Sequence, residues 1–343
     1  MDESVKELID ETEKLDINPE IPKYSTNWCD LPMEMRMECI KRMNFVTRTR
    51  LGATSHTENS LVEAKKYKYE WVKLMYCSCD PQDLHVITQK SVASGCTEMQ
   101  LHSRNNHEKT LNCLVQVLKK CEIDSFNFTE IDKAKALFWP EIKKCAPFRF
   151  KTFKSRSSDP KNALFLVKNC EGMENVFLNN KNDRGYKFKD FLELPVVINA
   201  KSVKLFCLHN PDDFHPLIKK WIINRSEVGK SLRFVHDSSQ CTVGVLQSFY
   251  MTFGNRAIFK NDTTIRIRTN DESKHILIQF VITYFGGEAY LCTIIPSNLP
   301  ESEYERDEQW VMDMFQKECS DDMNDKNHYN MKEFYAQNRN YFC

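Results

Sequence analysis

Strand-like and helix-like segments alternate regularly between residues 99 and 235, and this alternation constrains the fold most. Short runs rich in aromatic and β-branched residues lie at 99–102, 126–128, 148–150, 176–178, 203–205 and 232–234. Helix-like stretches separate them, at 111–120, 133–145, 161–170, 188–198 and 214–223. Such alternation predicts an α/β domain built on parallel strands.

The spacing of these runs makes the prediction more specific. With centres near residues 101, 127, 149, 177, 204 and 233, successive strands are 26, 22, 28, 27 and 29 residues apart. This is the length scale of leucine-rich repeats, so we predict a leucine-rich-repeat-like strand–helix array. The strict L-x-x-L-x-L-x-x-N text is absent, and an ordinary parallel sheet with helical crossovers remains the alternative.

The last third of the domain has a different pattern. Runs at 264–268, 275–284 and 289–296 follow one another without helices between them. Gly286 and Gly287 separate the last two, which predicts a C-terminal β-hairpin that closes the array and protects its edge.

Charge is balanced overall but unevenly placed. The 343 residues contain 48 basic and 48 acidic side chains, which argues against a general polyanion binder. Residues 1–24 carry eight acids and three bases, and residues 300–343 carry eleven acids and five bases. The remainder therefore has a net charge of +11, because the two ends together carry −11. We interpret 1–24 and 300–343 as acidic tails and 76–299 as the main domain.

A compact helical block is predicted at 25–75. Pro32 stands near the start of its first helix, and Met35, Ile40 and Met43 form one apolar stripe along it. Ser55-x-x-Glu58 is a capping box that opens a later helix. Three short helices in about 40 residues cannot bury much surface alone, so such a block normally needs a partner or a neighbouring domain.

The amino-acid sequence of this helical block resembles an F-box. The resemblance rests on residues 28–43, which begin with a Leu-Pro-x-Glu motif, and on residues 47–55 and 61–62. The sequence of these segments is similar to that of the expanded F-box families of nematodes. Residues 214–222 and 265–271 are similar to the F-box-associated regions of those families. Met37 and Cys39 replace the usual aliphatic residues, and Gly52 lies inside the second helix.

The resemblance implies a substrate-recruiting subunit of a cullin–RING (SCF-type) ubiquitin ligase, with no catalytic residues of its own. A Skp-family adaptor would dock on the apolar side chains Leu31, Pro32, Met35, Ile40, Met43, Leu51 and Leu61. The downstream domain would capture a protein substrate for ubiquitin-dependent degradation. The alternatives are an α/β-repeat interaction scaffold without ligase coupling and an α/β hydrolase, although no Gly-x-Ser-x-Gly elbow is present.

The scattered cysteines and the acidic N-terminal sequence favour a cytoplasmic or nuclear protein. The 14 cysteines are scattered, the start is acidic, and the most apolar stretch, 276–285, is too short to span a bilayer. We expect reduced thiols.

No cofactor, metal or catalytic residue is predicted. The phosphate-loop look-alike at 224–231 lacks its first glycine and is followed by a strand instead of a helix. Cys77, Cys79, His85 and Cys96 could supply zinc ligands, but C-x-C spacing is too tight for the usual knuckle.

Basic residues are predicted to form the substrate face. Apolar residues of each strand should face the helices, so their neighbours Arg149, Lys151, Lys204 and Arg233 should project from the other side. Such a stripe would attract an acidic or phosphorylated protein. The run 143–161 interleaves bases with phenylalanines, which also suits nucleic acid, but aromatic residues at i and i+2 fit a core-facing strand better.

Overall fold

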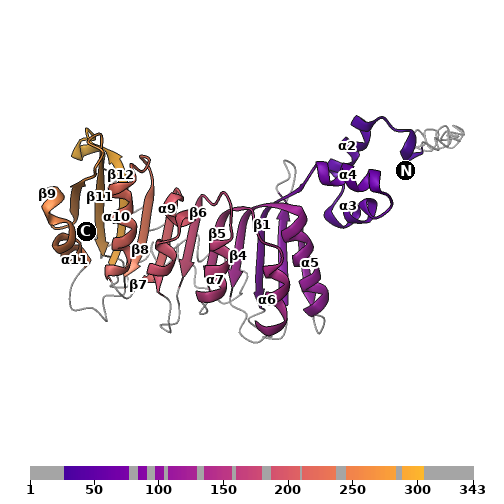
Figure 1. Ribbon diagram of the computed structural model, residues 1–343, viewed down its shortest axis with the longest axis horizontal. Coiled ribbons are helices and arrows are strands. Elements are labelled where there is room, and N and C mark those ends of the chain that lie inside the picture. Colours follow the sequence, from indigo (N-terminus) through magenta and orange to yellow (C-terminus); the bar gives the residue numbers. More distant parts are fainter. Residues whose placement is uncertain are drawn as a thin grey trace, which may run out of the picture. The chain divides into compact units, whose positions relative to one another are not determined.

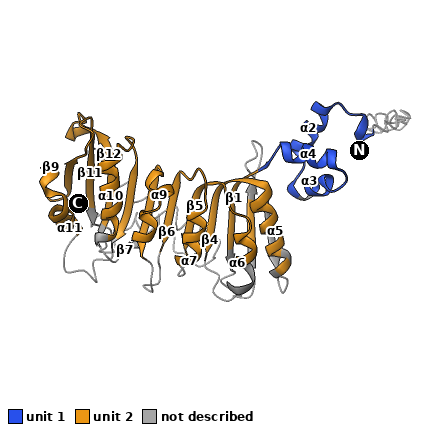
Figure 2. Ribbon diagram, in the orientation of Figure 1, with its two compact units in different colours: residues 1–67 blue, residues 68–343 orange. Residues whose placement is uncertain are grey.

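The chain divides into two compact units, Met1–Tyr67 and Lys68–Cys343 (Figure 2). The computed structural model describes residues 27–76, 84–90, 97–103, 107–129, 135–156, 160–179, 187–208, 211–236, 245–282 and 288–304. Strand β1 (Tyr67–Tyr76) spans the end of the predicted helical block, so the main domain begins earlier than residue 76.

The first unit is a set of short helices held by capping and by one buried arginine. Its elements are η1 (Trp28–Asp30), α2 (Met33–Arg42), α3 (Phe45–Gly52) and α4 (His56–Ala64). The Ser55 hydroxyl accepts a hydrogen bond from the Glu58 N–H at 3.1 Å, as the capping box predicts. Arg48 is buried, donates to the carbonyls of Lys41, Met43 and Lys65, and lies over the Tyr67 ring.

The second unit is built on a single twelve-stranded sheet in the order β3-β2-β1-β4-β5-β6-β7-β8-β12-β11-β10-β9 (Figure 1). The other strands are β2 (Leu84–Lys90), β3 (Thr97–Ser103), β4 (Cys121–Thr129), β5 (Phe150–Arg156), β6 (Asn175–Asn179), β7 (Ser202–Leu208), β8 (Ser231–His236), β9 (Ala257–Lys260), β10 (Thr264–Arg268), β11 (Lys274–Ile282) and β12 (Glu288–Pro296). Neighbours from β4 to β8 pair in parallel. The pairs β1–β2, β2–β3, β8–β12, β12–β11, β11–β10 and β10–β9 are antiparallel.

Helices cover one face of the parallel strands (Figure 1). The helices of the second unit are α5 (His107–Lys120), α6 (Lys135–Lys143), α7 (Pro160–Lys168), α8 (Phe188–Leu192), α9 (Pro195–Asn199), α10 (His215–Ile223) and α11 (Val245–Phe253), with 3-10 turns at Pro211–Phe214, Gly254–Arg256 and Glu301–Glu303. Those that connect the strands from β4 to β8 are α6 to α10. Because β4 to β8 follow one another in chain order, right-handed crossovers place every connecting helix on the same side. Among the described residues, the opposite face of these strands therefore carries no crossover helix.

The predicted leucine-rich-repeat-like array is wrong. Run 99–102 lies in β3, an antiparallel edge strand three places from β4 in the sheet, and is not the first repeat. The predicted hairpin is present as the antiparallel pair β11–β12, but it belongs to a block of four antiparallel strands, in which β12 also pairs with β8. A solenoid needs the same unit throughout, each contacting its neighbours in sequence. The architecture is a mixed α/β sheet.

A buried arginine holds the C-terminal segment against the sheet. Arg266 donates to His275 Nδ1, to the hydroxyl of Tyr304, and to three backbone carbonyls at distances of 2.7–3.3 Å. Its guanidinium also lies near the Tyr304 ring. Residues 296–304 are thereby fixed to β10 and β11 through one side chain.

This arrangement predicts a pH dependence of folding. Burial, followed by the charges of Arg266 and Arg268, lowers the pKa of His275 below its ordinary value. The unfolded chain therefore takes up this proton at a higher pH than the native protein, so stability is full above about pH 6.5 and falls as the pH drops below it. We expect the melting temperature to fall between about pH 7.5 and 5.5, and to fall less in a His275→Asn variant, whose amide oxygen still accepts from Arg266. Equal pH dependence in the two proteins would contradict this.

The structure describes the side chains of seven cysteines, and all are free thiols, namely Cys29, Cys39, Cys113, Cys121, Cys145, Cys170 and Cys292. Burial raises the pKa of Cys170 to about 12, which suits a core thiol and not a nucleophile. In the described part of the chain, no helix is long and apolar enough to cross a membrane.

Candidate functional site

The open face of the parallel strands presents two cross-strand rows of polar side chains. Alternate residues of a strand point to opposite faces, and the register aligns them from strand to strand. One row consists of Asn127, Lys154, Phe177, Lys204 and Arg233 on β4 to β8. The adjacent row consists of Ser125, Thr152, Asn175, Ser202 and Ser231 on the same strands.

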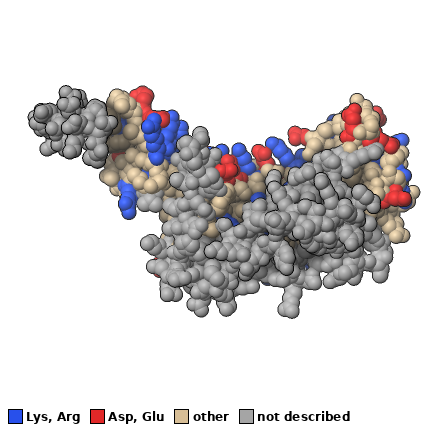
Figure 3. All heavy atoms as spheres, turned by 180° about the vertical axis from the view of Figure 1, so that it is seen from behind, with Lys and Arg blue, Asp and Glu red and all other residues tan. Residues whose placement is uncertain are grey.

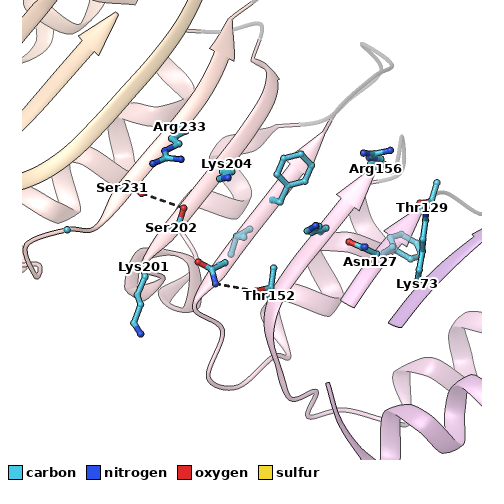
Figure 4. A pocket seen from close by; sticks show the side chains of 16 residues that line it. Lys73, Asn127, Thr129, Thr152, Arg156, Lys201, Ser202, Lys204, Ser231 and Arg233 are labelled. Carbon is cyan, nitrogen blue, oxygen red and sulfur yellow. Dashed lines mark hydrogen bonds between the residues drawn. The ribbon is translucent and has the colours of Figure 1, made fainter. Parts of the chain in front are cut away.

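A cavity of about 580 Å³ lies over these rows (Figure 4). It is lined by Lys73, Asn127, Phe128, Thr129, Thr152, Lys154, Arg156, Asn175, Val176, Phe177, Lys201, Ser202, Lys204, Gly229, Ser231 and Arg233. Six of the lining residues are Lys or Arg, and none is Asp or Glu. We call this hollow the basic cavity. Its lining also contains no His or Cys, so its chemistry is that of cations, hydroxyls and amides.

Lys204 and Arg233 form one side of the basic cavity. They are direct cross-strand partners on β7 and β8, and Figure 4 shows their side chains next to each other. Arg233 is half-buried, and its Nε is buried without a hydrogen-bond partner among the described residues. An unpaired buried donor is costly, by about 1–3 kcal/mol. A bidentate anion would satisfy it.

The opposite side contains three more cations. Lys73 comes from β1 and Arg156 from β5, and Figure 4 shows both near Asn127 and Thr129 of β4. Lys154, also on β5, is the register partner of Asn127. Phe177 lies between the two sides, because its strand partners are Lys154 on one side and Lys204 on the other. It packs against Phe206, with ring centroids 5.1 Å apart.

Small polar groups form the adjoining part of the lining. The Asn175 amide donates to the Thr152 hydroxyl at 3.2 Å, and the Ser231 hydroxyl donates to that of Ser202 at 3.5 Å (Figure 4). Lys201 is engaged elsewhere, in an ion pair with Glu174 at 3.0 Å. These hydroxyls and amides can donate to a ligand without adding charge.

The reverse side of the molecule shows Lys and Arg atoms on the second unit, beside Asp and Glu atoms (Figure 3). Lys201–Glu174 and Lys151–Asp124 are ion pairs of the second unit that lie outside or at the margin of the cavity. The unit thus mixes charges on its surface, whereas the charged residues of the cavity lining are all basic.

Half of the predicted substrate face lies in this cavity. Lys204 and Arg233 line it, whereas Arg149 and Lys151 do not. Arg149 precedes β5 and pairs with Glu171 at 3.5 Å, and Lys151 pairs with Asp124 at 3.5 Å. Both are exposed, as predicted, but they lie outside the cavity lining, because the alternation of buried and exposed residues along β5 shifts by one position after Phe150.

The same shift in the alternation of buried and exposed residues explains why Lys154 and Arg156 were not predicted to belong to the substrate face. Phe153 and Ser155 are buried, which turns Lys154 and Arg156 to the open face. In the sequence 153–156, the two basic residues alternate with Phe153 and Ser155, and this alternation indicates that the two cations share one face of the strand. Lys73 could not have been found in this way, because the sequence does not show that β1 lies next to β4.

The predicted adaptor-binding residues do not form one exposed apolar patch. Ile40 is 0% exposed and Leu61 is 5% exposed, so neither can contact a partner. Leu31, Met43 and Leu51 are half-buried, and Pro32 and Met35 are exposed. Ile40 and Leu61 thus belong to the interior of the first unit.

The zinc hypothesis cannot be placed: Cys77, Cys79 and Cys96 lie outside the described residues. Within the described ranges, no group of three or more His, Cys, Asp or Glu side chains could hold a metal ion.

Comparison with known proteins identifies no family. No family model matches the sequence, and no curated protein matches it. An rRNA methylase from Streptococcus thermophilus is 11% identical, with 56% of this chain and 98% of that chain covered and a TM-score of 0.22. An S-adenosylmethionine-dependent methyltransferase from Clostridium acetobutylicum is also 11% identical, with 53% and 70% covered and a TM-score of 0.14.

Both of these structures are enzymes, and neither is an F-box protein or a leucine-rich-repeat array. The predicted fold class, with its leucine-rich-repeat-like array, is wrong because the second unit is built on one mixed sheet. The comparisons give no support to the predicted role as a substrate-recruiting SCF ligase subunit, to the scaffold and hydrolase alternatives or to the expectation of a non-enzymatic chain. At TM-scores of 0.22 and 0.14 the matches give no basis for assigning methyl transfer or a cofactor. The F-box resemblance and the Skp-family partner stay predictions that nothing here tests.

Proposed function

We propose that the protein is a receptor for phosphate-bearing ligands and binds a phosphorylated or strongly acidic peptide segment in the basic cavity. The observation that supports this is the lining, with six Lys or Arg residues and no carboxylate around about 580 Å³. A concavity whose charged side chains are all basic raises the local concentration of anions.

The residue types suit phosphate in particular. Arg233 offers a planar, bidentate fork, and Lys204 beside it supplies a compact charge. The hydroxyls of Ser202 and Ser231 lie one register row away and can donate to the remaining oxygens. A phosphate, with three acceptor oxygens and nearly two charges, uses more of these donors than a carboxylate does.

Single-stranded nucleic acid fits this lining less well. Proteins that bind such strands combine a basic groove with several aromatic platforms for successive bases. The lining contains two aromatic residues, and one of them, Phe128, is only 2% exposed. The remaining platform, Phe177, can accommodate one ring.

The test is a binding measurement with degenerate peptide libraries that carry phosphoserine, phosphothreonine or phosphotyrosine, each beside its unphosphorylated counterpart. We expect fluorescence anisotropy to detect binding of phosphorylated peptides, competition by inorganic phosphate, and an affinity that falls as salt is raised. Equal binding of unphosphorylated peptides, or an affinity that does not change with salt, would overturn the proposal.

A further inference from the structure

The basic cavity has an apolar centre that a phosphate receptor does not by itself require. Phe177 stands in the middle of the row, between Lys154 on one side and Lys204 on the other. Its side chain is partly buried and lines the cavity, and its ring packs against that of Phe206. A ligand bound at the cationic pair on β7 and β8 therefore lies beside this ring.

We propose that the ligand's anchor is a phosphotyrosyl side chain, with its ring against Phe177 and its phosphate between Lys204 and Arg233. This inference rests on the proposed function and narrows its ligand class. Adjacent strands are about 4.8 Å apart, so Phe177 on β6 lies about 5 Å from the Lys204 backbone and about 10 Å from that of Arg233. A phosphate attached directly to an aromatic ring spans this separation, because ring and anion are rigidly joined.

The buried Nε of Arg233 provides the second observation. It has no hydrogen-bond partner among the described residues, and Arg233 makes no ion pair there. A phosphate oxygen pair can accept from this Nε and from one terminal nitrogen at the same time. Phosphoserine would place its phosphate nearer to its own backbone and leave the Phe177 ring uncovered.

The remaining cations suit residues that flank the phosphotyrosine. Lys73, Lys154 and Arg156 lie on the other side of Phe177, about 10 Å or more from Arg233 by strand count. Acidic residues next to the phosphotyrosine in the peptide would face this cluster. The preferred segment therefore combines a phosphotyrosine with neighbouring Asp or Glu.

The decisive variant is Phe177→Leu, which removes the ring but keeps apolar volume. We expect it to weaken binding of a phosphotyrosine peptide by about two- to tenfold, the range of an aromatic pair, and to leave a phosphoserine peptide of the same sequence unchanged. Phe177→Tyr keeps the ring and should restore phosphotyrosine binding. Circular dichroism and melting temperature check that each variant folds.

The outcomes separate this inference from the proposed function. If no phosphorylated peptide binds the native protein, the proposed function fails. If phosphoserine and phosphotyrosine peptides bind equally and Phe177→Leu changes neither, the function stands and the phosphotyrosine inference is wrong. If a nucleoside monophosphate binds more tightly than the phosphotyrosine peptide, the ring platform serves a base, and the inference is likewise overturned.

Discussion

Replacing Lys204 and Arg233 together by glutamate is expected to lower the affinity for phosphorylated peptides by more than about a hundredfold. Each charge-assisted hydrogen bond to a phosphate contributes about 1.5–3 kcal/mol, and the two side chains lie together on one side of the cavity. Losing both removes about 3–6 kcal/mol, before counting repulsion from the new carboxylates, and 1.4 kcal/mol is a factor of ten.

The matched control is Lys219→Glu with Lys220→Glu. Both lysines are exposed on α10, on the helix-covered side, and this variant changes the net charge by the same amount. We expect its binding to differ little from that of the native protein at moderate salt. Equal losses in both variants would show that net charge, and not the basic cavity, attracts the ligand. If the double glutamate variant does not fold, a variant with Lys204→Gln and Arg233→Gln, which removes both charges without reversing them, replaces it in the binding measurement.

The largest effect on stability is expected from Arg266→Lys, which should cost about 3–5 kcal/mol. The native guanidinium is 7% exposed and has five acceptors: His275 Nδ1, the Tyr304 hydroxyl and the carbonyls of Pro296, Ser297 and Leu299. A lysine ammonium has three donors without the planar fork, so at least two of these acceptors lose their partner. Leaving a buried acceptor unpaired costs about 1–3 kcal/mol.

Arg268→Lys is the control for this prediction. It lies two residues further along β10 and is exposed, so its replacement should alter the free energy of unfolding by less than about 0.5 kcal/mol. Denaturant unfolding measures both changes. A loss below about 1 kcal/mol in Arg266→Lys would mean that the C-terminal segment is not held in this way.

The positions of most central elements follow from local sequence. Runs 126–128, 176–178, 203–205 and 232–234 lie within β4, β6, β7 and β8, and stretch 111–120 lies within α5. These segments are predictable because hydrophobic periodicity depends on neighbours along the chain. Lys204 and Arg233 lie on the open face because each stands between two buried residues of its strand, a pattern that local sequence also displays.

In strand β5, hydrophobic periodicity does not predict which face of the sheet each side chain points to. Phe148, Phe150 and Phe153 are all buried, which no strict alternation produces, and the facing of every basic residue from 149 to 156 depends on where the phase changes. A single-residue slip moves a side chain to the other face. The change occurs also in β4, where Cys121 and Ile123 are buried at odd positions and Phe126 and Phe128 at even ones. The two strands are paired, so the change is a property of the pair.

The sequence by itself therefore determined an alternating α/β domain, the location of its central strands and a basic character for their open face. Only the tertiary structure decided the direction of the outer strands, the pairing of β12 with β8 and the gathering of six cations into one cavity. Lys73 and Arg233 are 160 positions apart in the sequence and line the same hollow because β1 lies beside β4. Strand order and direction depend on long-range packing and hydrogen bonding between segments, and local periodicity carries no information about either.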